Sequence, residues 1–193
     1  MTNSYINLRH LFVGRHVVIY TTTASVLVIL NFAAGLLASA INVPGASGLI
    51  TGFTVPFFLV ILNRTTKSFG SMTMCWIIYS TISIPLYLMG PPNIFKPIFG
   101  FIIALAFELP ILIFKQKKFS YYLGLFTYTA AIIGMAYVAF AFLNLPGSKN
   151  AYKYMLPIAL IFSIEGCISV FVAHKVYENN VLGSHIERFF HMR

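Results

Sequence analysis

The acidic residues are the side chains whose type and position could do chemistry. Of the four in the chain, Glu178 and Glu187 belong to a charged C-terminal stretch, whereas Glu108 and Glu165 each stand inside a long apolar segment. A carboxylate in the hydrocarbon core of a membrane costs about 2.5–3.5 kcal/mol or more, so it needs a partner, a proton or access to water. We therefore predict that at least one of the two lies in a polar binding site for a ligand with positive charge or several donors. The alternative is a protonated glutamate that is hydrogen-bonded to a neighbouring helix.

Aromatic and amide side chains form a second group of candidates. Tyr137 and Asn144 are seven residues apart and so share one face of a helix, and Tyr154 flanks the outer end of the last apolar segment. Such groups could stack on a flat ligand and donate hydrogen bonds to it, although the aromatic belt of a membrane interface explains the tyrosines equally well. The candidate substrate-binding residues are Glu108, Glu165, Tyr137, Asn144 and Tyr154.

Several other chemistries have no counterpart in the sequence. It contains no phosphate-binding loop, no His-Glu-x-x-His and no Gly-x-Ser-x-Gly, and Cys75 and Cys167 stand in apolar segments without other metal-ligating residues at suitable spacing. We expect no enzymatic activity, no catalytic residue, no metal site and no cofactor. The net charge of +9 could suggest nucleic acid, but the basic residues lie between apolar segments and are better interpreted as topology signals. We therefore expect no nucleic-acid partner.

The elements that must position these residues are apolar helices. Among the 193 residues 59% are hydrophobic and 9% charged, and the mean hydropathy of +0.84 argues against a soluble domain. The sequence predicts an all-α, polytopic membrane protein with six transmembrane helices in one domain, residues 1–176. A basic tail, residues 177–193, follows as an interfacial helix or a loosely ordered end. The predicted helices are at about 17–41, 47–62, 70–88, 97–114, 120–145 and 155–176.

The distribution of positive charge predicts the orientation. With the N-terminus in the cytoplasm, ten of the 13 Lys and Arg residues fall on the inner side, which leaves Lys96, Lys149 and Lys153 outside. We therefore expect cytoplasmic N- and C-termini and a multi-pass protein of the cell membrane. In this orientation Glu108 and Glu165 would both lie roughly 15–17 Å below the outer boundary.

Two further features concern loops and small residues. The uncharged first outer loop, residues 42–48, could fold back into a cavity as a lid that contains Pro44, Gly45 and Gly48. Ala34 and Ala38 are four residues apart on the first helix, so another helix could approach closely there. This helix belongs either to the protein itself or to a partner.

A series of local motifs resembles one transporter family. An alanine-rich first helix precedes Pro44-Gly45, and the short second helix contains Gly-Phe-Thr-Val-Pro-Phe-Phe-Leu from Gly52. An inner Arg/Lys turn then leads to Gly70, and an outer Gly90-Pro91-Pro92-Asn93 with Lys96 leads to a helix that contains Gly100 and ends in an acidic residue and Pro110. This run from Ala33 to Pro110 resembles the substrate-binding S components of energy-coupling factor (ECF) vitamin transporters.

The resemblance implies a small membrane protein that captures a vitamin or related micronutrient from outside. It would deliver the ligand by docking on a transmembrane coupling subunit that works with ATPase subunits in a prokaryotic plasma membrane. By this resemblance Ala34 and Ala38 would form the docking face, and the outer halves of the last three helices would form the pocket. The two glutamates and the aromatic residues would suit thiamine or its pyrimidine precursor. The alternative function is a non-catalytic small structural subunit of a larger membrane complex.

Overall fold

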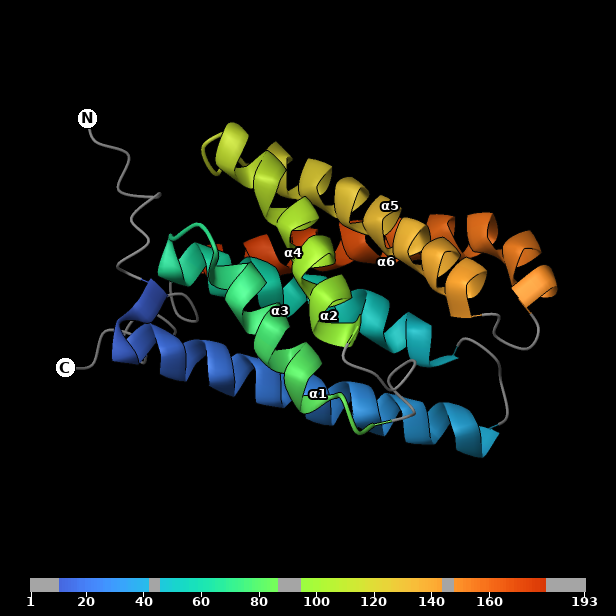
Figure 1. Ribbon diagram of the computed structural model, residues 1–193. Coiled ribbons are helices and arrows are strands. Elements are labelled where there is room, and N and C mark those ends of the chain that lie inside the picture. The colour runs from blue at the N-terminus through green and yellow to red at the C-terminus, as the bar shows by residue number, and fades with distance from the viewer. Residues whose placement is uncertain (1–10, 42–45, 87–94, 144–147, 180–193) are drawn as a thin grey trace.

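The computed structural model describes residues 11–41, 46–86, 95–143 and 148–179 (Figure 1). These ranges form six helices and contain no β-strand, so the predicted all-α class is confirmed for them. The helices are α1 (Gly14–Ile41), α2 (Ala46–Thr66), α3 (Ser71–Ile82), α4 (Phe95–Ile113), α5 (Lys118–Leu143) and α6 (Ser148–Glu178).

The six helices form a closed ring. Successive helices run in alternate directions, as the colour gradient of Figure 1 shows. Helix α1 contacts α2 and α3, α4 lies between α3 and α5, and α6 contacts α5 and α2. The order around the ring is therefore α1, α2, α6, α5, α4, α3. Helices α2 and α3, which are not neighbours in this order, also contact each other across the ring. Helix α6 thus lies beside α2, far from it in the sequence.

Four of the helices are long and apolar enough to cross a membrane. Their candidate spans are Gly14–Ala40, Phe95–Ile113, Lys118–Val138 and Leu156–Glu178. Helices α2 and α3 contain the shorter apolar segments Ile50–Thr66 and Ser71–Ile82. Large apolar side chains also cover much of the outer surface, an arrangement that suits contact with lipid. The structure therefore supports a helical membrane protein.

Aromatic and amide side chains fill the interior between α1, α3 and α5. The ring of Trp76 stacks on Tyr79 with the centroids 4.7 Å apart, and its edge meets Tyr128 at 6.2 Å. The buried Asn31 of α1 donates a hydrogen bond from Nδ2 to the hydroxyl oxygen of Tyr79 at 2.8 Å. A buried amide without such a partner would be costly, so this contact fixes α1 against α3.

Helices α4 and α5 approach each other closely at Gly124. A Cβ atom at this position would lie 2.5 Å from the carbonyl oxygen of Phe107, a backbone atom that cannot move unless α4 moves with it. Nearby, Thr127 Oγ1 donates a hydrogen bond to the carbonyl oxygen of Ala106 at 2.6 Å. The absence of a side chain at Gly124 is therefore a condition for the packing of α4 on α5.

This packing predicts a difference between two glycines of the same helix. Gly124→Ala should destabilise the protein by about 1–3 kcal/mol, because the added methyl group overpacks the contact with α4. Gly134→Ala is the matched control, since no atom lies within 4 Å of a Cβ atom there. It should leave stability unchanged or raise it by up to about 1 kcal/mol, because alanine favours helix over glycine. Thermal unfolding of the purified protein in detergent measures both effects, and equal midpoints for the two variants would contradict the packing.

Candidate functional site

Glu108 is completely buried near the end of α4, where hydrogen-bond donors surround its carboxyl group. Oε1 accepts hydrogen bonds from the backbone N–H groups of Gly70 at 2.9 Å and Met72 at 3.1 Å, and from Ser71 Oγ at 3.4 Å. Oε2 accepts from the backbone N–H and the hydroxyl of Thr73, at 3.3 and 2.7 Å. All of these donors belong to the turn before α3 and to the first turn of α3.

The geometry of this turn explains the contact. The first N–H groups of a helix have no partner within the helix, and the helix N-terminus carries a partial positive charge. Gly70 has a φ of 92°, which glycine adopts without strain, and it places its N–H against Glu108. The carboxyl group of α4 therefore caps α3. Its contacts favour the interpretation of Glu108 as a residue hydrogen-bonded to a neighbouring helix.

Glu165 lies in a different environment, on the face of α6 that packs against α2. A Cβ atom at Gly52 would lie 2.5 Å from Glu165 Oε2 and 2.7 Å from Cδ1 of Phe162, so the missing side chain of Gly52 makes room for both. Further along α6, Ser169 Oγ donates a hydrogen bond to the carbonyl oxygen of Phe53 at 2.7 Å. Glu165 Oε2 is buried, and none of the described residues donates a hydrogen bond to it. This oxygen is the acceptor best suited to a donor from outside the chain.

The two glutamates lie at different levels of the bundle. Glu165 packs against Gly52 in the first half of α2, whereas Glu108 binds Gly70, which follows the end of α2 at Thr66. The part of α2 between Gly52 and Thr66 extends about 20 Å at 1.5 Å per residue. The structure therefore separates the side chains that the sequence places at equal depth. Glu108 lies in the last two turns of α4, which ends at Ile113, whereas α6 continues well beyond Glu165 to Glu178.

Among the other predicted substrate-binding residues, the structure describes the side chain of Tyr137 alone. Tyr137 lies on α5 with 57% of its surface exposed. Tyr154 lies in α6, but its side chain is outside the described part of the structure. Gly48, predicted in the lid, lies in the first turn of α2, where a Cβ atom would meet the ring of Phe162 at 3.1 Å. Asn144, Pro44 and Gly45 lie outside the described residues.

The pair of alanines predicted to dock a partner is divided by burial. Ala34 is only 2% exposed, so it packs inside the protein's own bundle. Ala38 is partly exposed. Of the two residues, only Ala38 therefore retains surface for a partner helix.

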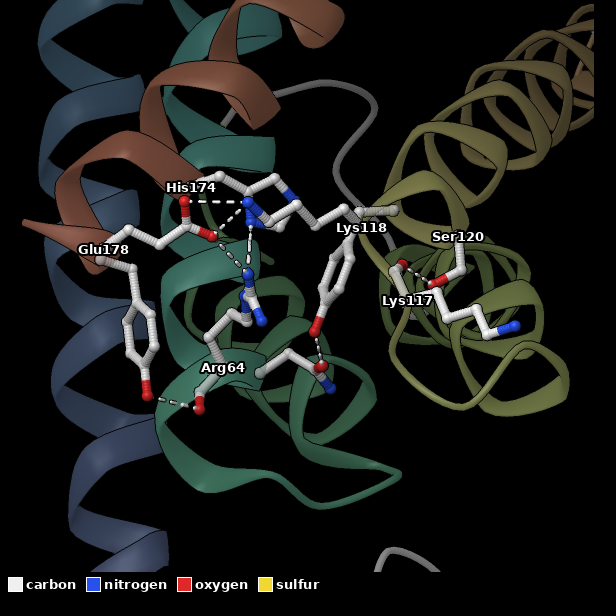
Figure 2. A network of polar contacts seen from close by, with 9 residues as sticks. Arg64, Lys117, Lys118, Ser120, His174 and Glu178 are labelled. Carbon is white, nitrogen blue, oxygen red and sulfur yellow. Dashed lines mark hydrogen bonds and ion pairs between the residues drawn. The ribbon is translucent and has the colours of Figure 1, made fainter.

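The structure also contains a charged cluster that the sequence analysis did not identify (Figure 2). Arg64 at the end of α2 and Lys118 at the start of α5 both bind Glu178 at the end of α6. Arg64 Nη2 lies 3.3 Å from Glu178 Oε1, and Lys118 Nζ lies 2.8 and 2.9 Å from the two carboxylate oxygens. Exposed ion pairs contribute little individually, but this one carboxylate connects three helices.

His174 completes the cluster as a buried hydrogen-bond acceptor. Arg64 Nε lies 3.3 Å from His174 Nδ1 and, because arginine only donates, Nδ1 accepts and the ring proton resides on Nε2. The ring of His174 meets that of Tyr121 edge-on at 5.0 Å, and the Arg64 guanidinium lies over the rings of Tyr121 and Tyr177 at 5.6 and 5.4 Å. His174 is thus a neutral acceptor here rather than a cation at a helix end. The four-residue spacing of His174 and Glu178 is the sequence signal that could have indicated it.

The different surroundings of Glu108 and Glu178 predict different responses to the loss of each carboxylate. Glu108→Gln should destabilise the protein by roughly 2–4 kcal/mol, because the amide NH₂ would face N–H and O–H donors in a buried place. Glu178→Gln is the matched control at an exposed position and should cost about 0–1 kcal/mol. Thermal unfolding in detergent distinguishes them. A small shift for Glu108→Gln, equal to that of the control, would show that the carboxyl group does not hold α3.

Comparison with known proteins does not assign the site to a family. The chain matches no protein-family model, no curated protein and no solved structure. The resemblance to the ECF S components therefore rests on the sequence pattern. The functional interpretation depends on the geometry of Glu165 and on the charge distribution.

Proposed function

We propose that the chain is the substrate-binding subunit of an ATP-driven importer. It captures a vitamin or related micronutrient from the outer side of a prokaryotic plasma membrane and passes it to separate coupling and ATPase subunits. In this proposal all six helices cross the membrane, α2 and α3 as short spans, and both termini are cytoplasmic. The alternating helix directions are consistent with six crossings (Figure 1).

The observation that carries the proposal is the unpartnered oxygen of Glu165. This carboxyl group belongs to a candidate membrane span and faces Gly52 of α2. Its Oε2 atom is buried, yet it accepts no hydrogen bond from the described residues. Buried carboxyl oxygens without a donor are unfavourable, whereas a ligand with a positive charge or several N–H groups would satisfy this one. A thiamine-type compound or its pyrimidine precursor has this chemistry.

The charge distribution supports capture from the outer side. We call one end of the bundle the basic end. It comprises the C-terminal ends of α2 and α6, the turn between α2 and α3, and the turn between α4 and α5. Its cations are Arg64, Lys67, Lys115, Lys117, Lys118 and Lys175. The positive-inside rule places this end in the cytoplasm. Gly52 lies in the half of α2 away from the basic end, so Glu165 lies toward the outer side.

The opposite end contains a lysine in a different role. Lys96 Nζ donates hydrogen bonds to the carbonyl oxygens of Ser83 and Leu86 at 2.6 and 2.9 Å. These oxygens follow the end of α3, where a cation is favourable. Lys96 therefore stabilises the end of α3 at the outer end of the bundle. Its structural role explains a cation there, so it does not argue against cytoplasmic termini.

A small structural subunit of a larger membrane complex is the second candidate function. Two observations favour it: Glu108 is satisfied by the protein's own donors, and Ala34 is buried in its own bundle. This alternative requires Glu165 to contact a partner chain or to have no role in ligand binding. The response of Glu165 to substitution separates the two functions.

The importer proposal predicts that Glu165→Gln weakens ligand binding. Radiolabelled thiamine and its pyrimidine precursor are equilibrated with the purified full-length protein, and denatured extracts are analysed by mass spectrometry for a co-purified compound. Glu165→Gln should weaken binding at least tenfold, because a hydrogen bond to a charged group contributes about 1.5–3 kcal/mol. Glu178→Gln should bind normally, since Glu178 lies at the basic end. Unchanged binding by Glu165→Gln, or a wild-type protein that neither retains nor binds any vitamin-like compound, would refute the proposal.

A further inference from the structure

The turn between α4 and α5 presents apolar and basic side chains on the same surface. Phe114 and Phe119 are 38% and 49% exposed, and their rings pack edge-to-face with the centroids 4.9 Å apart. Lys115 and Lys117, which lie between them in the sequence, are exposed as well. The candidate spans of α4 and α5 meet at this turn, so the turn lies at the boundary of the apolar region.

The backbone of the turn adopts a conformation that lysine does not favour. Lys115 has a φ of 53° and Gln116 a φ of 59°, both in the left-handed region. This conformation is unfavourable for an L-residue with a side chain and is usually adopted by glycine or asparagine at the end of a helix. A positive charge near the C-terminus of α4 offsets part of this cost. The sequence thus retains a cation where a smaller residue would relax the turn.

Within the described ranges, Lys115 and Lys117 have no neutralising carboxylate. Lys118, the next cation in the turn, binds Glu178. Among the described residues, no carboxylate forms an ion pair with Lys115 or Lys117. Arg64 and Lys175 belong to the same basic end, so the local excess of positive charge extends beyond the turn. An anionic ligand would complement this surface.

We propose that the α4–α5 turn binds the headgroup of an anionic phospholipid. The ammonium groups of Lys115 and Lys117 attract the phosphate, while the rings of Phe114 and Phe119 lie among the upper acyl-chain carbons. An acidic protein segment would complement only the charge, whereas a lipid satisfies the exposed rings and the cations together. A basic residue near an anionic membrane contributes about 1 kcal/mol, so two lysines suffice for a measurable lipid preference. This inference requires a membrane location but not the importer function.

The test compares lipids that differ in headgroup charge. Purified, delipidated full-length protein in detergent is titrated with dioleoyl phosphatidylglycerol or dioleoyl phosphatidylcholine, and bound lipid is counted by native mass spectrometry. We expect about tenfold tighter binding of phosphatidylglycerol, and loss of this preference in the double variant Lys115→Gln/Lys117→Gln. Lys67→Gln is the matched control, because Lys67 is exposed with a φ of 49° at the same end but does not lie between two phenylalanines that contact each other. It should change the preference less than twofold.

Two further measurements make the outcome decisive. The double variant Lys115→Arg/Lys117→Arg retains both charges and should keep the preference, which separates loss of charge from misfolding. Equal binding of the two lipids by the wild-type protein, or a full preference in the glutamine double variant, would overturn the proposal. Binding of polyglutamate without any lipid preference would instead identify the turn as a site for an acidic protein partner.

Discussion

The arrangement of the bundle depends on one buried carboxyl group at the N-terminus of α3. Glu108 holds the first N–H groups of α3, and a polar network continues from there. Ser71 Oγ, which contacts Glu108, accepts a hydrogen bond from Asn63 Nδ2 at 3.2 Å, and the hydroxyl of Tyr121 donates to Asn63 Oδ1 at 2.9 Å. The ring of Tyr121 in turn contacts Arg64 and His174. Five of the six helices therefore meet through one connected set of side chains. Hydrogen-bonded networks of this kind rigidify a structure. Within this one, His174 Nε2 is buried and has no hydrogen-bond partner among the described residues.

The two halves of the bundle are held together by different means. At the basic end polar contacts join α2, α3, α4, α5 and α6. Toward the other end α2 and α6 pack through Gly48 and Gly52, where the close approach leaves Glu165 against the α2 backbone. Small residues allow such helix contacts without hydrogen bonds. The two buried glutamates therefore differ in their contacts: donors of the protein itself satisfy Glu108, whereas none of the described residues donates a hydrogen bond to Glu165 Oε2.

Hydrophobic length made the helices predictable, but not the partners of their polar residues. The predicted helix at 97–114 agrees closely with Phe95–Ile113, because nothing except apolar length defines it. The third helix, predicted to reach residue 88, ends at Ile82, since Pro85 has no N–H group with which to continue the helical hydrogen bonds. Sequence spacing revealed Glu108 as an unusual residue. It could not reveal that the donors lie 35 to 38 positions earlier, because that contact arises only when α3 and α4 pack. The acceptor role of His174 could not be predicted for the same reason, because it requires Arg64, 110 residues away.

The ring order has a consequence for biosynthesis. During synthesis α6 follows the other five helices, yet it lies beside α2 and closes the ring. Until then no part of α6 packs against Gly48 and Gly52 of α2, and Arg64 lacks its partners His174 and Glu178. The ring therefore closes only after α6 has been synthesised, and until then the first five helices can form no more than an open arc.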